Sequence, residues 1–220
     1  MRVLRVCLIS QSRTYGKVQN SYDDLISLSE SPNAIGFKIM YNHGILYFDQ
    51  DFMTKISEAG IKIIHLIRRN KLLQYVSNAG NKIDLLLANK GPNTHQPHPS
   101  SREEAMRIRD EVSITESPEK ILKKMRRKKN EDDHVTHSIL SSLDSANYAT
   151  IYYEDLCQNT KAQMSRLFNF LGVDDISVES SLVKIHQGKP TSFYFGERYR
   201  DTLKKAVEGS EFAWTLDGWE

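Results

Sequence analysis

A chain of 220 residues with 39% hydrophobic side chains can bury one substantial core, which excludes fibrous, collagenous and wholly disordered proteins. A net charge of +2 excludes recruitment of nucleic acid or anionic lipid by a global field, and every apolar run is far shorter than the ~20 residues of a membrane span. The only cysteines, Cys7 and Cys157, are too few for a disulfide framework or a cysteine-rich zinc site, and they fit a reducing compartment such as the cytoplasm. We expect a single domain over residues 1–220.

Strands and helices are expected to alternate through the first part of the chain. Residues 3–9 and 34–41 are apolar and partly β-branched, which predicts two strands, and residues 22–28 predict a brief helix. Residues 51–59 carry apolar side chains at helical spacing, and Gly60 provides a natural C-cap.

The apolar run at residues 62–67 predicts a central strand that is buried on both faces. Residues 72–76 open the helix that follows it. This alternation of strands and helices predicts an α/β fold with a parallel sheet.

The next segments combine loops with one clearly marked helix. Residues 89–101 are rich in Pro, Asn, His and Ser and predict a flexible loop. Ser117-Pro-Glu119 marks a helix start, because serine caps the helix, proline suits its first turn and glutamate complements its dipole. We expect this helix to fray at the acidic residues 131–133, within a second flexible loop at residues 126–146.

The last third of the chain predicts a strand at residues 149–153 and two helices. Residues 161–171 carry an apolar stripe that we expect to lie in the core, and Gly172 closes this helix. Residues 199–207 predict an amphipathic helix. The aromatic residues between 212 and 219 are expected to pack back on the body of the protein.

The most informative feature is a pair of arginines, Arg68 and Arg69, that directly follows the strand at residues 62–67. In α/β folds, ligands bind at the carboxyl ends of the strands, and a planar guanidinium there suits an anionic oxygen cluster. The expected ligand is therefore a nucleotide phosphate.

Several separated blocks resemble the sulfotransferase superfamily in their order and spacing, and within it they are most similar to the nodulation-type carbohydrate sulfotransferases and their plant and algal relatives. The resemblance extends over roughly residues 34–220. The blocks lie at residues 64–72 with Ser77, 153–156 and 170–172, with further similar segments at 36–44, 87–89, 93–95 and 182–188.

This resemblance implies a three-layer P-loop-like α/β fold with a mostly parallel central sheet flanked by helices. It implies a transferase that moves a sulfuryl group from 3'-phosphoadenosine 5'-phosphosulfate (PAPS) to a hydroxyl of a carbohydrate or similar acceptor, with no metal. Arg68 and Ser77 are implied to hold the 3'-phosphate, with Arg69 as an alternative to Arg68. Lys189, on a late loop, is a further candidate phosphate contact.

Catalysis in such an enzyme needs a base that takes the acceptor's proton. His43 follows the strand at residues 34–41 and is the candidate base. His65 lies within a strand and is expected to be buried or packed at an edge. His95 and His98 lie in a flexible loop, and their spacing predicts solvated loop histidines in preference to metal ligands.

The block Tyr153-Glu154-Asp155 is expected to support the structure. Its carboxylates end a strand at the edge that holds the arginines, where they can cap the next helix or pair with a basic group.

The N-terminal part, residues 1–33, departs from the family. Family members carry a glycine- and hydroxyl-rich loop that cradles the 5'-phosphosulfate, whereas this chain has no Gly-X-X-X-X-Gly-Lys-Ser/Thr motif. Residues 10–17 supply hydroxyls and cations that form a degenerate loop, or else the N-terminus is divergent or truncated. The alternative function is therefore a catalytically inactive nucleotide-binding or interaction protein.

A third class, a nucleic-acid binder, depends on the basic residues between Lys123 and Lys129. This run lacks interleaved aromatic side chains, so we expect a solvated helix end and no nucleic-acid partner. The sequence leaves the acceptor, the compartment and the oligomeric state open.

Overall fold

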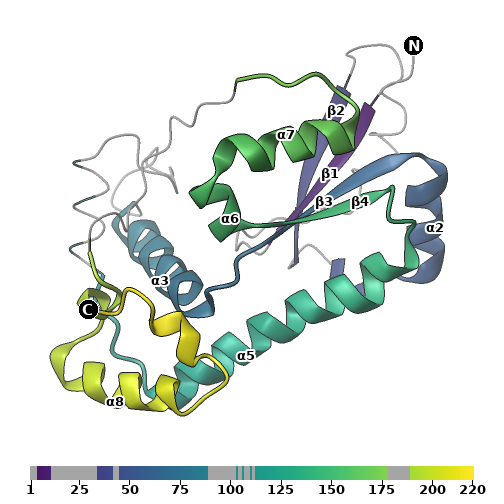
Figure 1. Ribbon diagram of the computed structural model, residues 1–220. Helices are drawn as coiled ribbons and strands as arrows, with labels where there is room; N and C mark the ends of the chain where they lie inside the picture. The colour runs from purple at the N-terminus through teal and green to yellow at the C-terminus, as the bar shows by residue number, and fades with distance from the viewer. Residues whose placement is uncertain are drawn as a thin grey trace. The chain divides into compact units, whose positions relative to one another are not determined.

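The computed structural model describes residues 4–10, 34–41, 45–88, 112–177 and 189–220, together with residues 103, 106 and 110 (Figure 1). The helix expected at residues 22–28 and the loop expected at 89–101 lie outside the described residues. The chain divides into two compact units, one of residues 1–69 and 129–178 and the other of residues 70–128 and 179–220. Each unit has its own hydrophobic core.

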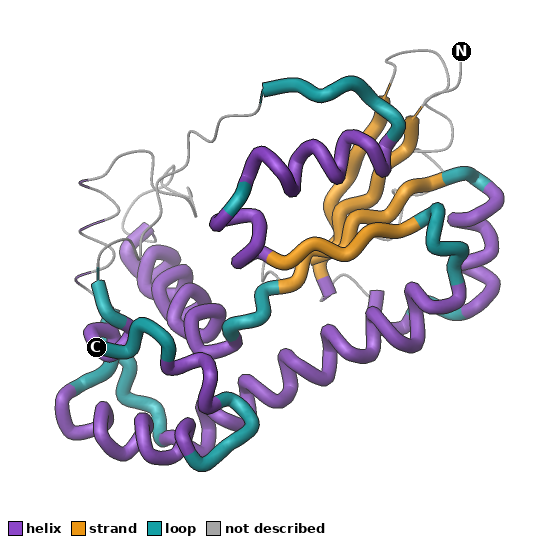
Figure 2. Tube along the Cα trace, in the orientation of Figure 1, coloured by secondary structure: helices purple, strands orange, loops and turns teal. Residues whose placement is uncertain are grey.

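A parallel four-stranded sheet forms the centre of the first unit (Figure 2). Its strands are β1 (Leu4–Ser10), β2 (Ala34–Met40), β3 (Ile61–Ile67) and β4 (Tyr148–Tyr152). They lie in the order β2-β1-β3-β4, and all three pairings are parallel. The predicted α/β class with a parallel sheet is therefore confirmed.

The register of the sheet brings the carboxyl ends of its strands to one edge. Ser10, the last residue of β1, pairs with Met40 of β2 and with Leu66 of β3. Ile67 of β3 pairs with Tyr152 of β4. The residues that follow β2, β3 and β4 therefore leave the sheet at the same edge, which is where ligands bind in α/β folds.

Helices lie on both faces of this sheet. Helix α2 (Gln50–Glu58) contacts β3. Asp49 is its N-cap, and the Asp49 side chain accepts a hydrogen bond from the Phe52 N–H. Helix α6 (Tyr153–Gln158) follows β4 directly, and α7 (Thr160–Leu171) contacts β4. The predicted C-cap Gly172 is confirmed, with a φ angle of 72°. Gly60, with a φ angle of 64°, directly follows Ala59, which is the C-cap of α2.

The core of the first unit lies on the face of the sheet that α2 covers. β3 contributes Ile61 and Ile63, and α2 contributes Met53 and Ile56. Alternate residues of a strand point to opposite faces, so His65 lies on this same face of β3. The full set of buried residues in this core is Ile39, Tyr41, Ile45, Met53, Ile56, Ile61, Ile63, Val135, Ile139, Leu140 and Leu143.

The apolar stripe of α7 is less buried than the sequence predicts. Phe168 is buried, whereas Met164, Leu167 and Leu171 are half-buried. On this side of the sheet the Lys62 ammonium lies 5.1 Å from the centre of the Phe170 ring. Long side chains such as lysine cover apolar surface with their methylene groups. The apolar side chains of α7 are therefore only partly shielded from solvent.

Helix α5 corrects two expectations. It begins at Pro118 as predicted, but it does not fray at residues 131–133, because it extends to His134 and continues as a π-helix (Val135–Ile139) and a 3-10 helix (Leu140–Ser142). Most of the segment expected as a loop at residues 126–146 is therefore helical. The reason is burial, since Asp132 is buried and hydrogen-bonded and Val135 and Ile139 belong to the core.

The second unit is built from helices. It holds α3 (Lys71–Ala88), most of α5 (Pro118–His134), α8 (Glu197–Glu208) and two 3-10 helices, Thr191–Tyr194 and Ala213–Leu216. An isolated parallel bridge joins Ile114 to Phe195.

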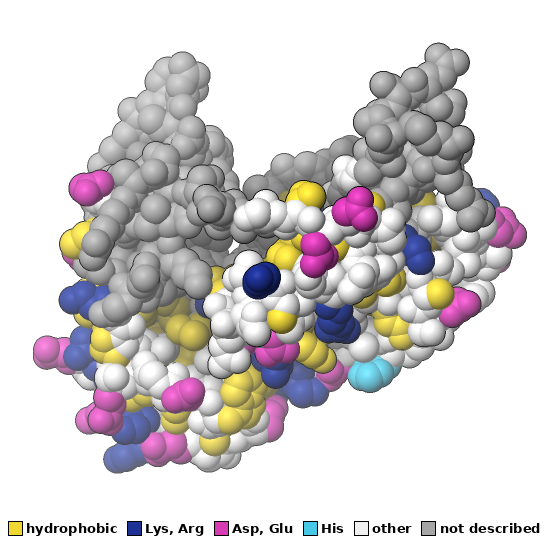
Figure 3. Space-filling view, turned by 45° about the horizontal axis from the view of Figure 1, so that its top comes forward, with side chains coloured by type: hydrophobic (Ala, Val, Ile, Leu, Met, Phe, Trp, Pro, Cys, Tyr) yellow, Lys and Arg dark blue, Asp and Glu magenta, His cyan; other side chains and the backbone are white. Residues whose placement is uncertain are grey.

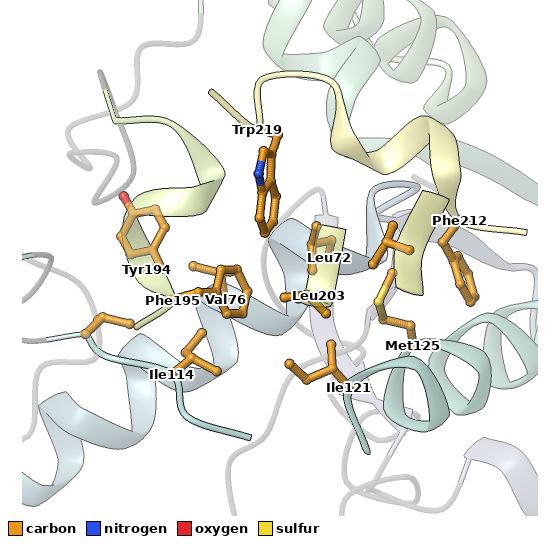
Figure 4. Packing of buried hydrophobic residues seen from close by; sticks show 12 residues of the cluster. Leu72, Val76, Ile114, Ile121, Met125, Tyr194, Phe195, Leu203, Phe212 and Trp219 are labelled. Atoms are coloured by element: carbon orange, nitrogen blue, oxygen red, sulfur yellow. The ribbon is translucent and has the colours of Figure 1, made fainter. Parts of the chain in front are cut away.

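The core of the second unit collects apolar side chains from all these helices (Figure 4). Phe212 and Trp219 belong to it, which confirms that the C-terminal aromatic residues pack back on the body. The Trp219 ring stacks on Phe195 with centroids 5.6 Å apart, and the Ser192 N–H donates to the Trp219 carbonyl. The full set of buried residues is Leu72, Val76, Val112, Ile114, Ile121, Met125, Tyr194, Phe195, Leu203, Val207, Phe212 and Trp219.

Candidate functional site

The candidate site lies at the carboxyl edge of the sheet, where β3 ends in Arg68 and Arg69 and β4 ends in Tyr153, the first residue of α6. Because β3 and β4 are neighbours and end level with each other, the two arginines face the first turn of α6. This edge therefore brings two cations, two tyrosine rings and two carboxylates together.

Arg69 is held by β4 and α6. Its guanidinium forms an ion pair with Asp155 and lies 4.2 Å from the centre of the Tyr152 ring, and its backbone N–H donates to Glu154 at 3.0 Å. The expected supporting role of Glu154 and Asp155, pairing with a basic group at this edge, is what the structure has. Arg69 therefore connects the end of β3 to the start of α6.

Arg68 has different surroundings. Its guanidinium lies 4.8 Å from the centre of the Tyr153 ring and is half-buried. Burial lowers the pKa of Arg68, and the neighbouring Tyr153, Glu154 and Cys157 side chains oppose that shift. A cation that has lost part of its hydration binds an anion more strongly than a fully solvated one, because the low local dielectric strengthens the attraction.

Tyr153 links Arg68 to the exposed thiol of Cys157, one helical turn along α6. Burial raises the pKa of Tyr153, and its hydrogen bond with Cys157 adds to the rise. The phenol therefore stays neutral at physiological pH, and its ring supports the guanidinium of Arg68.

Ser77 and Lys189 belong to the second unit. Ser77 is half-buried on α3, which starts at Lys71 after Asn70, whose side-chain oxygen accepts a hydrogen bond from the Leu73 N–H. Lys189 is exposed, with its ammonium 4.7 Å from the centre of the Phe193 ring. Because Arg68 belongs to the first unit, a shared ligand between it and these two residues stays a prediction.

Of the histidines singled out in the sequence, the structure describes His65. His65 is buried as expected, and its Nε2 lies 2.6 Å from the hydroxyl of Tyr41, which donates at 2.8 Å to Asp132. His43, His95 and His98 lie outside the described residues, so the role of His43 as a base stays a prediction. The candidate phosphosulfate loop at residues 10–17 also lies outside them, except for Ser10, the last residue of β1.

Sequence reasoning missed the network of Tyr41, His65 and Asp132. Its members lie far apart in the chain, and Asp132 was assigned to a fraying helix end. One signal was available, because Asp132 follows Met125 by seven residues and so lies on the apolar side of an extended α5.

Among the described residues, no cluster of three or more His, Cys, Asp or Glu side chains is arranged to hold a metal ion. In the same part of the chain, no helix is both long enough and apolar enough to cross a membrane.

Several cations of the basic run on α5 form ion pairs with carboxylates. Lys124 pairs with Glu116, Arg126 pairs with Glu211, and Lys129 pairs with Asp133. On the face shown in Figure 3, cationic and anionic side chains are interspersed over the described residues. The absence of a nucleic-acid partner stays a prediction.

Comparison with known proteins finds no matching family model and no matching curated protein. Among solved structures, a sulfotransferase domain from the curacin biosynthetic pathway aligns with 89% of this chain at 16% identity and a TM-score of 0.35. The alignment covers 52% of that domain, so the chain spans about half of its length. The mouse sulfotransferase SULT7A1, solved in complex with PAP, aligns with 100% of this chain and 90% of its own at 14% identity and a TM-score of 0.38.

Proposed function

We propose that this protein is a PAPS-dependent sulfotransferase that acts on a hydroxyl of a carbohydrate or similar acceptor. The observation that supports this proposal best is the half-buried guanidinium of Arg68 at the carboxyl edge of a parallel sheet. The order of the sequence blocks around residues 64–77, 153–156 and 170–172 supports the same class.

In this proposal, Arg68 binds the 3'-phosphate of the nucleotide together with Ser77, and Lys189 adds a further cation. Arg69 was the alternative to Arg68, but its ion pair with Asp155 and its contact with Tyr152 give it a supporting role. In this proposal, Arg68 therefore binds the 3'-phosphate and Arg69 supports the structure around it.

The proposed reaction is an in-line transfer. The acceptor oxygen forms a bond to sulfur while the bond between sulfur and the bridging phosphate oxygen breaks, so adenosine 3',5'-bisphosphate (PAP) leaves with the electron pair. The acceptor proton passes to a base, for which we propose His43. Cations near the leaving phosphate stabilise the charge that develops on it.

Nucleotide binding is tested by thermal unfolding with PAP, which raises the melting temperature if it binds the native state. We expect a clear rise for the wild-type protein and the loss of most of it in Arg68→Ala. Arg166→Ala, which removes an exposed arginine of α7, is the matched control and should keep the full rise. A wild-type protein whose melting temperature does not respond to PAP would contradict the proposal.

Sulfuryl transfer is tested with radiolabelled PAPS and a panel of neutral and amino oligosaccharides. We expect label on at least one sugar, and His43→Ala should lower the transfer rate about 100-fold or more while keeping the response to PAP. Binding of PAP without transfer to any acceptor would instead favour the catalytically inactive nucleotide-binding protein.

A further inference from the structure

The core of the first unit contains a buried polar network of three side chains. Tyr41, His65 and Asp132 expose only 3%, 0% and 5% of their surface. The His65 Nε2 lies 2.6 Å from the Tyr41 hydroxyl, and that hydroxyl donates to the Asp132 carboxylate at 2.8 Å. Three separate elements, the end of β2, strand β3 and helix α5, are thereby joined.

The direction of these hydrogen bonds follows from their geometry. A phenol has one hydrogen, and Tyr41 gives it to Asp132. The Tyr41 oxygen therefore accepts from His65, which must carry a hydrogen on Nε2. Tyr41 is thus held from two sides, which fixes the orientation of its ring.

The network crosses the sheet near its carboxyl edge. Strand β1 lies between β2 and β3, so the Tyr41 side chain reaches across β1 to His65. Tyr41 follows Met40, the partner of Ser10, while His65 pairs with Ile9. The network therefore links β2 to β3, the two strands that flank β1, close to the carboxyl end of β1.

The last turn of α5 makes a second contact with the residues that follow β2. His134, two residues beyond Asp132, has its Nε2 3.2 Å from the carbonyl oxygen of Leu46. Tyr41 and Leu46, which both follow β2, are therefore each hydrogen-bonded to a residue near the end of α5.

Stability alone does not account for this arrangement. Burying a phenol, an imidazole and a carboxylate costs desolvation free energy, and apolar residues of similar size would fill the same space at lower cost. What the polar side chains add is a defined geometry, because hydrogen bonds are directional and apolar contacts are not.

We propose that Tyr41, His65 and Asp132 are positioning residues for the anion-binding edge. They set the ends of β2 and β3 relative to β1, and His65 lies three residues before Arg68, so they determine where the Arg68 guanidinium meets the nucleotide. All three are buried, so in this proposal they act through the position of Arg68 and not by contact with the ligand. This inference rests on the proposed function, since it assumes that Arg68 binds the 3'-phosphate.

The test compares two ligands by isothermal titration calorimetry. PAP carries the 3'-phosphate and adenosine 5'-phosphate lacks it, so the ratio of their dissociation constants isolates the contribution of the 3'-phosphate. We expect the wild-type protein to bind PAP at least tenfold more tightly than adenosine 5'-phosphate. Tyr41→Phe, which removes only the hydroxyl, should reduce this ratio at least threefold.

Two control variants separate positioning from general destabilisation. Tyr47→Phe makes the same chemical change on a side chain that is 88% exposed, and Ile56→Val weakens the same core without touching the network. Both should keep the wild-type ratio. Asp132→Asn keeps an acceptor oxygen for the Tyr41 hydroxyl, so it should lower the ratio less than Tyr41→Phe.

The outcomes are distinguishable. If the wild-type protein prefers PAP and Tyr41→Phe keeps the full preference, the positioning role is overturned while the proposed function stands. If the wild-type protein binds neither ligand, the proposed function fails and the positioning role fails with it. Should Tyr41→Phe not fold, Asp132→Leu, which removes the acceptor of the Tyr41 hydroxyl, decides by the same ratio, and an unchanged ratio there overturns the inference.

Discussion

Adjacent arginines at the end of β3 have different environments, although sequence alone makes them equivalent. Arg69 points to β4 and α6, where Asp155 and the Tyr152 ring surround it. Arg68 lies on Tyr153 and has lost part of its hydration.

The ion pair of Arg69 with Asp155 should contribute modestly to stability. The two side chains are 43% and 38% exposed, so solvent screens their attraction. We expect Arg69→Ala to lower the free energy of unfolding by about 1 kcal/mol, including the lost contact with the Tyr152 ring. Urea unfolding of Arg69→Ala, Asp155→Ala and the double variant should give a coupling free energy of about 0.5 kcal/mol. A coupling of zero would show that the pair does not stabilise the connection between the end of β3 and α6.

The elements that the sequence predicted well are those with local signals. Pro118 after Ser117 starts α5, and Gly172 ends α7, because capping depends on residues within a few positions. The far end of α5 could not be predicted, because the contact of Asp132 with Tyr41 spans 91 residues. The contact of Arg68 with Tyr153 is of the same kind. The strand ends were predictable, but the different surroundings of Arg68 and Arg69 required the register of β3 and β4.

Two glycines that end helices test the role of backbone conformation. Gly172 has a φ of 72° and a left-handed conformation, and a Cβ built there meets no atom within 4 Å. Gly172→Ala should therefore cost about 1 kcal/mol for conformational reasons alone, and Gly172→Asn should cost less. Thermal and urea unfolding measure the loss.

Gly209 is the matched control, because it ends α8 with a φ of −80°. Its added Cβ would lie 3.5 Å from the Lys205 carbonyl oxygen, an ordinary contact distance. Gly209→Ala should leave stability unchanged or raise it slightly, since alanine reduces the freedom of the unfolded chain. Equal losses at both positions would contradict the conformational explanation.

At the scale of the whole molecule, the chain builds two cores from segments that alternate in sequence. Residues 1–69 and 129–178 form one unit, and residues 70–128 and 179–220 form the other. Both tryptophans lie in the second unit, with Trp219 buried and Trp214 54% exposed. Tryptophan fluorescence therefore reports on the second core.

Replacing each tryptophan in turn measures what the C-terminal segment contributes to this core. Trp219→Ala removes a ring that is 5% exposed and stacked on Phe195, so it should lower the free energy of unfolding by about 3–5 kcal/mol. Trp214→Ala should change it by less than about 1 kcal/mol. Urea unfolding followed by far-ultraviolet circular dichroism gives both values. A small loss for Trp219→Ala would show that the C-terminal segment contributes little to the second core.

The pairing of β4 with β3 also has a consequence for biosynthesis. Arg69 and Glu154, which meet at the end of these strands, are separated by 85 residues. A nascent chain that has emerged from the ribosome only as far as α5 therefore carries β3 with one of its edges uncovered. Such an edge attracts other strands, so we expect the β3 edge to be a site of aggregation during translation until β4 has been made and pairs with it.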